Sequence, residues 1–133
     1  MSTFLERLAA GETLVSDGAT GTNLHYMGLK MGVSPEELVL DDPDLLLKLE
    51  SAFVQAGSDI ILTCTFGATR LRLAASGLAD KVVEINQKAV ALAKKAIAER
   101  DVLLAGSIGP TGGMMQPLGP LSAEDARAAF SEQ

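Results

Sequence analysis

Three short segments combine small, polar and acidic residues where the surrounding hydrophobic pattern breaks. Residues 17–22 read Asp-Gly-Ala-Thr-Gly-Thr, residues 63–68 read Thr-Cys-Thr-Phe-Gly-Ala, and residues 106–113 read Gly-Ser-Ile-Gly-Pro-Thr-Gly-Gly. Each one includes or directly follows the end of an apolar run that predicts a β-strand. Because α/β proteins bind their ligands at the carboxyl ends of strands, these segments are the candidate functional loops.

The first loop offers a carboxylate beside flexible backbone. Asp17 can accept hydrogen bonds from an ammonium group, while nearby backbone N–H groups can face the carboxylate of the same ligand. The loop would therefore suit an amino acid. Asp-Gly and Thr-Gly pairs also occur in turns that bind nothing, so a purely structural turn is an equal alternative from these residues alone.

The second loop contains Cys64, the only cysteine of the chain, and His25 is the only histidine. A cysteine nucleophile needs a neighbouring base or an electropositive setting, and His25 belongs to a different segment. One cysteine and one histidine also fall short of the usual number of zinc ligands. We expect Cys64 to be a small buried residue and assign His25 no role.

The third loop has the glycine content of a phosphate-binding loop but not its other features. It contains no lysine and does not open directly into a helix, so it matches a nucleotide motif weakly. A complete small α/β protein of flavodoxin-like topology, with an anionic cofactor at its strand ends, is one hypothesis that this loop leaves open.

The elements that must position these loops alternate between strand and helix. Strands are predicted at 13–16, 59–66 and 102–107. A strong helix follows Asp42 and ends at Gly57, and a longer one covers about 78–100 after a short helical piece that ends at Ser76. This alternation predicts parallel strands joined by right-handed crossovers.

The remaining segments are less regular. A short helix opens the chain after the capping residues Ser2 and Thr3, and a last helix begins at Ser122 with Asp125 in a capping box. Residues 23–41 read as a long connection without a sustained period, in which Ser34-Pro35-Glu36-Glu37 could start a single helical turn and residues 23–27 look helical.

Composition narrows the class of protein. The 133 residues are 47% hydrophobic, which predicts one folded domain over 1–133. A formal charge of -6 disfavours nucleic acid and anionic membrane surfaces as partners. The sequence contains neither a secretory signal pattern nor an apolar run of membrane-spanning length, which together with a single cysteine predicts a cytoplasmic protein.

The order and spacing of the three loops, together with Ala-Gly-Ser-Asp-Ile-Ile at 56–61, resemble the homocysteine S-methyltransferase family. Members of that family are (β/α)8 TIM barrels that transfer a methyl group to the homocysteine thiolate and so produce methionine. The resemblance implies an α/β fold of parallel (β/α) units, the N-terminal portion of such a barrel, truncated within the third or fourth unit. It covers nearly all of this chain and less than half of the family's domain.

The resemblance also implies roles for individual residues. Asp17 would hold the amino group of homocysteine, and the loop around it would position the amino acid portion. The implied substrate-binding residues are Asp17, Gly18, Ala19, Thr20, Gly21, Thr65, Phe66 and Ser107. No catalytic residue and no metal ligand is assigned, and Cys64 stands where the family more often has asparagine.

Cofactors and partners follow from the same resemblance. Family members bind zinc through three cysteines, one after a middle strand and an adjacent pair after a late strand, and this sequence has none of those positions. Zinc is therefore expected in the full-length family domain and not in this chain, and cobalamin or another methyl donor is possible through further domains. The expected partners are homocysteine and either a complementary C-terminal half or further copies of the chain. The alternative function is a non-catalytic partial barrel that self-associates or pairs with a partner.

Overall fold

Helix α4 (Pro43–Ala56) begins and ends where its sequence signals predict. In the computed structural model, which describes residues 3–133, the Asp42 side chain accepts the backbone N–H of Leu45 at 3.1 Å. Pro43 occupies the first turn, where its missing N–H costs nothing. Gly57 ends the helix with a φ of 97°, a left-handed conformation that favours glycine.

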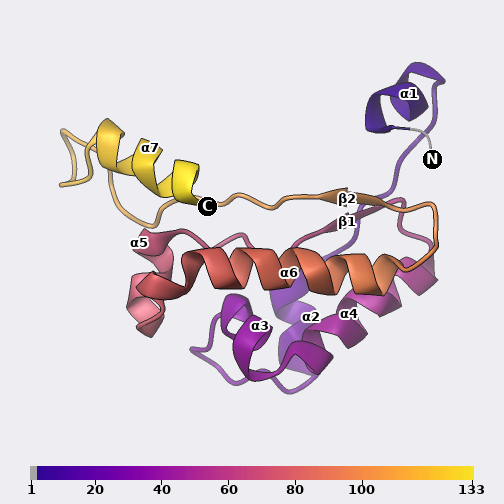
Figure 1. Ribbon diagram of the computed structural model, residues 1–133, viewed down its shortest axis with the longest axis horizontal. Helices are drawn as coiled ribbons and strands as arrows, with labels where there is room; N and C mark the ends of the chain where they lie inside the picture. Colours follow the sequence, from indigo (N-terminus) through magenta and orange to yellow (C-terminus); the bar gives the residue numbers. More distant parts are fainter. Residues whose placement is uncertain (1–2) are drawn as a thin grey trace.

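Helix α6 (Val82–Ile97) packs along α4 and forms the second half of the helical layer (Figure 1). Before it come α5 (Arg70–Leu73) and two short 3-10 helices, η2 (Ala74–Ser76) and η3 (Ala79–Lys81). Apolar side chains at helical spacing form its buried face, as the sequence predicts. They are Val82, Ile85, Ala89, Ala93, Ala96 and Ile97.

The strands are parallel and follow the predicted order. Strand β1 (Ile60–Leu62) pairs with β2 (Leu103–Ala105), with Ile60 opposite Leu103. On the other edge of β1, the predicted strand 13–16 is reduced to one isolated parallel bridge between Ser16 and Ile60. The strands are shorter than predicted because the chain turns from Thr63 onward, where side-chain hydrogen bonds replace the ladder.

Three helices occupy much of the segment predicted as a long connection, which is therefore more regular than predicted, although the helical turn near Pro35 and the helical character of residues 23–27 are confirmed. They are α2 (Thr20–Tyr26), η1 (Pro35–Glu37) and α3 (Leu38–Asp41). Helix α2 begins inside the first candidate loop, although its residues are poor helix formers. Leu24 is fully buried against Leu29, Leu38 and Leu49, and this tertiary packing stabilises a helix that local composition does not favour.

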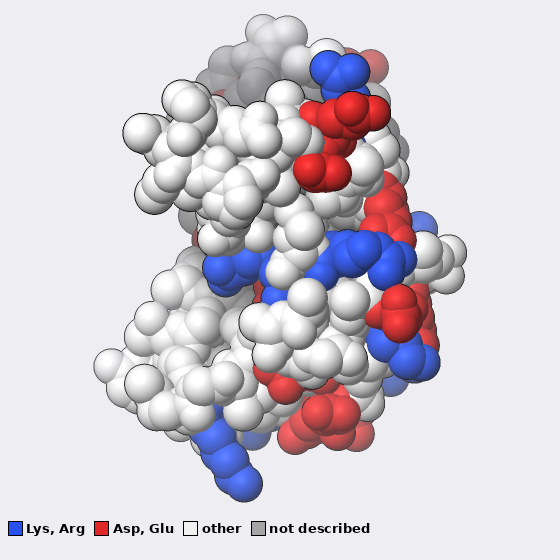
Figure 2. Space-filling model, turned by 90° about the vertical axis from the view of Figure 1, so that its left-hand side faces the viewer, with Lys and Arg blue, Asp and Glu red and all other residues white. Residues whose placement is uncertain are grey.

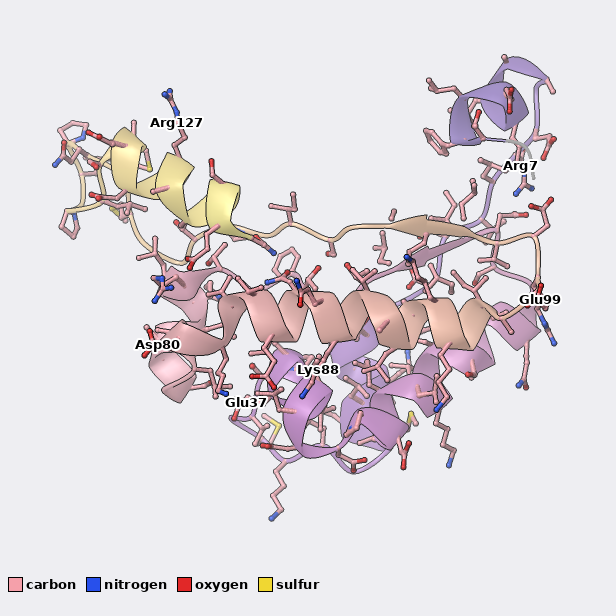
Figure 3. The ribbon with its side chains drawn as sticks, viewed as in Figure 1. Arg7, Glu37, Asp80, Lys88, Glu99 and Arg127 are labelled. Carbon is pink, nitrogen blue, oxygen red and sulfur yellow. The ribbon has the colours of Figure 1, made fainter. Side chains whose placement is uncertain are left out.

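Two helices lie at opposite ends of the sheet (Figure 1). Helix α1 (Phe4–Ala9) is capped by Thr3, whereas Ser2 lies outside the described residues. Its Arg7 reaches back to the beginning of β1, where it pairs with Asp59 at 2.8 Å (Figure 3). Helix α7 (Ala123–Glu132) starts where predicted, because the Ser122 hydroxyl accepts the N–H of Asp125 at 3.0 Å.

The described helices cover only one face of the sheet along its length (Figure 1). Ile61 points into this helical layer and is 0% exposed, whereas its neighbour Leu62 is 39% exposed. A parallel sheet normally has both faces covered, so the Leu62 face is an unusual apolar surface. Among the described residues, no helix has the length and apolar character needed to cross a membrane.

Replacing Ile61 by alanine should lower the free energy of unfolding by about 2 to 4 kcal/mol, because it leaves a cavity in the core. Replacing Leu62 should cost less than about 1 kcal/mol, because that side chain is already partly in water. Urea unfolding of both variants, followed by circular dichroism, measures the difference. Equal losses would contradict the one-sided coverage of the sheet.

Candidate functional site

Asp17 is held at the carboxyl end of the strands by three hydrogen bonds. Its backbone N–H donates to the carbonyl of Ile60 at 2.9 Å, which continues the pairing of Ser16 with β1. Its Oδ2 accepts the N–H of Leu62 at 3.0 Å, and its Oδ1 accepts the Ser16 hydroxyl at 3.0 Å. The carboxylate is therefore fixed in position and is partly exposed, so it keeps acceptor capacity for a ligand.

The rest of the first loop rests on α4. A side chain at Gly18 would begin 3.2 Å from the ring of Phe53, so glycine allows the loop to approach this helix closely. Ala19 is the residue before α2, and Thr20 and Gly21 lie in its first turn. The structure thus brings all five predicted residues of this loop together, with the last two in a helix and not in a loop.

The second and third loops are joined by hydroxyl groups. The Thr65 hydroxyl donates to the Ser107 carbonyl at 2.8 Å, and the Ser107 N–H donates to the Thr63 hydroxyl at 3.1 Å. The two threonine oxygens are 2.7 Å apart and both side chains are buried. Gly109 donates its N–H to the Phe66 carbonyl at 3.0 Å, so the network ties two strand ends into one unit.

A cavity of about 420 Å³ lies beside this network and includes Thr65 and Ser107 in its lining. Phe66 is exposed next to it. The predicted residues therefore form two groups on the two flanks of β1, with residues 17–21 on one flank and the Thr65–Ser107 pair on the other. The remaining lining residues of the cavity are Thr63, Asn86, Gln87, Val90, Gly106, Ile108 and Gln133.

A larger cavity of about 1170 Å³ lies between α5 and α7, and none of the predicted site residues lines it. Figure 2 shows basic side chains crossing the hollow on this side of the molecule. Arg70 and Arg72 line the cavity, and Arg70 is paired with Glu132 and Asp80. Sequence reasoning missed this cavity because its walls come from segments far apart in the chain.

Glu50, on α4, is a second residue that sequence reasoning missed. It is 4% exposed, and neither carboxyl oxygen has a hydrogen-bond partner among the described residues. Burial and, secondly, the negative charge of Asp17 raise the pKa of Glu50 to about 8. The available signal was an acidic residue between Leu49 and Phe53 on the apolar face of this helix.

Cys64 is buried as predicted, with 6% exposure. Burial raises the pKa of its thiol, and the charges of Glu36 and Glu50 raise it further. The Nδ1 atom of His25 lies 2.8 Å from the carbonyl oxygen of Leu29. The ring of His25 is therefore engaged with its own segment of the chain and not with Cys64. Among residues 3–133, no group of three or more His, Cys, Asp and Glu side chains could hold a metal ion.

Comparison with known proteins identifies the family. The model of the homocysteine S-methyltransferase family matches residues 14–133, so the chain belongs to this family. It is 33% identical over 132 residues to betaine–homocysteine S-methyltransferase 1 of Danio rerio, which covers 97% of this chain and 32% of that protein. It is also 33% identical over 105 residues to S-methylmethionine–homocysteine S-methyltransferase BHMT2 of Pongo abelii, covering 78% of this chain and 28% of that protein.

Solved structures of a family member are similar in fold. The oxidized form of the homocysteine methyltransferase MmuM from Escherichia coli has a TM-score of 0.72 and 29% identity, over 84% of this chain and 42% of that one. The metallated form of the same enzyme has a TM-score of 0.69. The chain thus spans less than half the length of the relatives and structures it matches.

The Cys64 thiol should be inert toward a thiol reagent such as dithiobis(nitrobenzoate) in the folded protein at mildly alkaline pH. Burial excludes the reagent and keeps the thiol protonated, and the thiolate is the reactive form. One thiol per chain should react after unfolding in guanidinium chloride. Rapid reaction of the folded protein would contradict the buried environment of Cys64.

Glu50 should make the protein less stable as the pH rises from about 4.5 to about 8. In that window the folded state keeps a proton that the unfolded state has released, so stability falls with pH and levels off above it. Glu50→Gln removes this titration and keeps the shape of the side chain. The difference in unfolding free energy between wild type and variant, measured across this window, should grow in favour of the variant. A constant difference would contradict the raised pKa.

Proposed function

We propose that this chain supplies the homocysteine-binding part of a homocysteine S-methyltransferase, which transfers a methyl group to the homocysteine sulfur and releases methionine. The observation that carries the proposal is the Asp17 carboxylate, which hydrogen bonds from Leu62 and Ser16 fix beside the carboxyl end of β1. Membership of the family over residues 14–133 supports the same activity.

In this proposal the two flanks of β1 bind different parts of one ligand. Asp17 accepts the ammonium group of homocysteine, and the backbone of Gly18 to Gly21 positions the amino acid portion. Thr65, Phe66 and Ser107 line the region that receives the rest of the molecule. The hydroxyl network between Thr63, Thr65 and Ser107 holds the loops in register, so the ligand meets a preformed surface.

The residues of this chain do not fit a zinc site, because the only cysteine is buried and protonated. We propose that the zinc expected for the full-length family domain is bound by residues that this chain does not contain. A reducing compartment, the cytoplasm, suits a protein whose single cysteine is free.

The exposed face of the sheet favours a partner for this chain. Leu62 lies on the face that the helices leave open, and β2 has its outer edge unpaired among the described residues. We propose that further parallel (β/α) units cover this face and continue the sheet beyond β2, as in a closed (β/α)8 barrel. The alternative is a non-catalytic chain that pairs with copies of itself. Light scattering distinguishes these two proposals, because only self-pairing gives a defined homo-oligomer of this chain.

Asp17→Asn should weaken the binding of L-homocysteine by about 10- to 100-fold, because a charged acceptor of the ammonium group is lost. The asparagine carbonyl can still accept the N–H of Leu62, so the fold is kept. Isothermal titration calorimetry measures both affinities, and Asp41→Asn, on an exposed residue, serves as the control. Equal affinity of wild type and the Asp17 variant, or no binding by wild type, would contradict the proposal.

A further inference from the structure

The cavity of about 1170 Å³ between α5 and α7 contains a guanidinium group that the proposed function does not use. Arg72 lines this cavity, and no ion pair within the described residues involves it, whereas Arg70 is already paired. The Arg72 side chain lies against Gly112 of the third loop, because a side chain there would begin 2.7 Å from Cδ and 3.2 Å from Nη1 of Arg72. The guanidinium is therefore positioned by the loop and can still bind an anion.

The third loop supplies hydrogen-bond donors beside this guanidinium. Thr111, Gly112 and Gly113 line the same cavity, and their backbone N–H groups donate to no carbonyl group among the described residues. Thr111 is 8% exposed, and a donor in so buried a residue normally has a partner. Successive backbone N–H groups next to an arginine are typical components of an anion site. The glycine content that this loop shares with phosphate-binding loops is thus placed beside a positive charge.

A carboxyl group lies in another wall of the same cavity. Glu36 is 5% exposed, and its Oε1 accepts the N–H of Gly67 at 2.6 Å. Its Oε2 accepts no hydrogen bond among the described residues, and it is not sealed from solvent as the two oxygens of Glu50 are. Glu36 and Arg72 form no ion pair with each other. A buried acceptor is therefore available to a donor that enters the cavity.

The balance of charge around the cavity favours a zwitterion over a doubly charged anion. The acidic residues in its lining are Glu36, Asp125 and Glu132, and the basic ones are Arg70 and Arg72. A phosphate dianion would add two negative charges to walls that already carry more acidic than basic groups. An α-amino acid instead brings one charge of each sign, and each charge has a matching group in the lining.

Apolar side chains form other parts of the cavity wall. Leu71 is 40% exposed although it lines the cavity, and Leu73, Pro120 and Leu121 belong to the same lining. Small-molecule sites combine such apolar walls with a few polar groups that fix the orientation of the ligand. The wall therefore suits an amino acid with an apolar side chain better than one with a charged side chain.

We propose that this cavity is a second ligand site, which binds a free α-amino acid with an apolar side chain. The ligand carboxylate is bound by the Arg72 guanidinium and by backbone N–H groups of residues 111–113, and the ligand ammonium donates to Oε2 of Glu36. None of the residues implied for homocysteine lines the cavity, so this site does not rest on the proposed function. A bound amino acid would link η1, α5 and the third loop.

L-Leucine is the probe for this site, because it has both charges and an apolar side chain. Isothermal titration calorimetry of the chain should show binding, and Arg72→Gln should weaken it by about 10- to 100-fold, since a charged donor is lost. Arg127→Gln, on an exposed residue of α7 that points away from the molecule, should bind as wild type does (Figure 3). Equal affinity of wild type and Arg72→Gln, or no binding by wild type, would overturn the proposal.

The role of Glu36 is tested with a ligand that lacks the amino group. 4-Methylpentanoate keeps the carboxylate and the hydrocarbon chain of leucine. Glu36→Gln can still accept the N–H of Gly67, so the fold is kept, and it should weaken leucine binding by about tenfold without weakening that of 4-methylpentanoate. An equal loss for both ligands would overturn the assignment of the ammonium group to Glu36.

Two further measurements distinguish the cavity from the first loop and from a phosphate site. Asp17→Asn should still bind leucine, and leucine should shift the amide NMR signals of Gly112 and Gly113 in this variant. Binding that Asp17→Asn abolishes and Arg72→Gln leaves intact would place the amino acid at the first loop and overturn the second site. Inorganic phosphate should not displace leucine, and displacement that depends on Arg72 would overturn the preference for a zwitterion.

Discussion

The position of the three candidate loops depends on the pairing of β1 along both of its edges. Its backbone bonds to Val15 and Asp17 on one side and to β2 on the other, all in the parallel direction. Parallel strands end at the same edge of a sheet, so three chain segments that lie far apart in sequence deliver their loops to one place. A strand of only three residues achieves this because the loops add their own hydrogen bonds beyond it.

Helix α4 links the packing of the protein to the chemistry of its candidate site. One face carries the apolar side chains that pack against α2 and α6, which is the usual role of a helix beside a parallel sheet. The same helix places Phe53 against Gly18 and buries the carboxyl of Glu50 with no hydrogen-bond partner among the described residues. The free energy that α4 gains from apolar burial offsets the cost of burying an unpartnered acid, so a polar group is held where packing alone would exclude it.

The chain spans less than half the length of the relatives it matches, and this agrees with our proposal that further units cover the exposed face of the sheet. MmuM shares this fold over a region that is 42% of its own length, and the relatives from Danio rerio and Pongo abelii are matched over about a third. The apolar side chain of Leu62 is exposed here, on the face that our proposal covers with further (β/α) units.

The sequence by itself determined the family, the alternation of strand and helix, and the ends of α4. The ends of α4 could be predicted because the Asp42 cap and the Gly57 terminus each act within one helical turn. It also indicated Asp17, Thr65 and Ser107 as candidate site residues, since their types interrupt the apolar pattern at strand ends. Only the tertiary structure decided that α2 begins at Thr20, inside the first candidate loop, that the strands are short, and that Glu50 is buried. These features depend on contacts between residues distant in the chain, such as Leu24 with Leu49 and Thr65 with Ser107, and local periodicity carries no information about which distant surfaces meet.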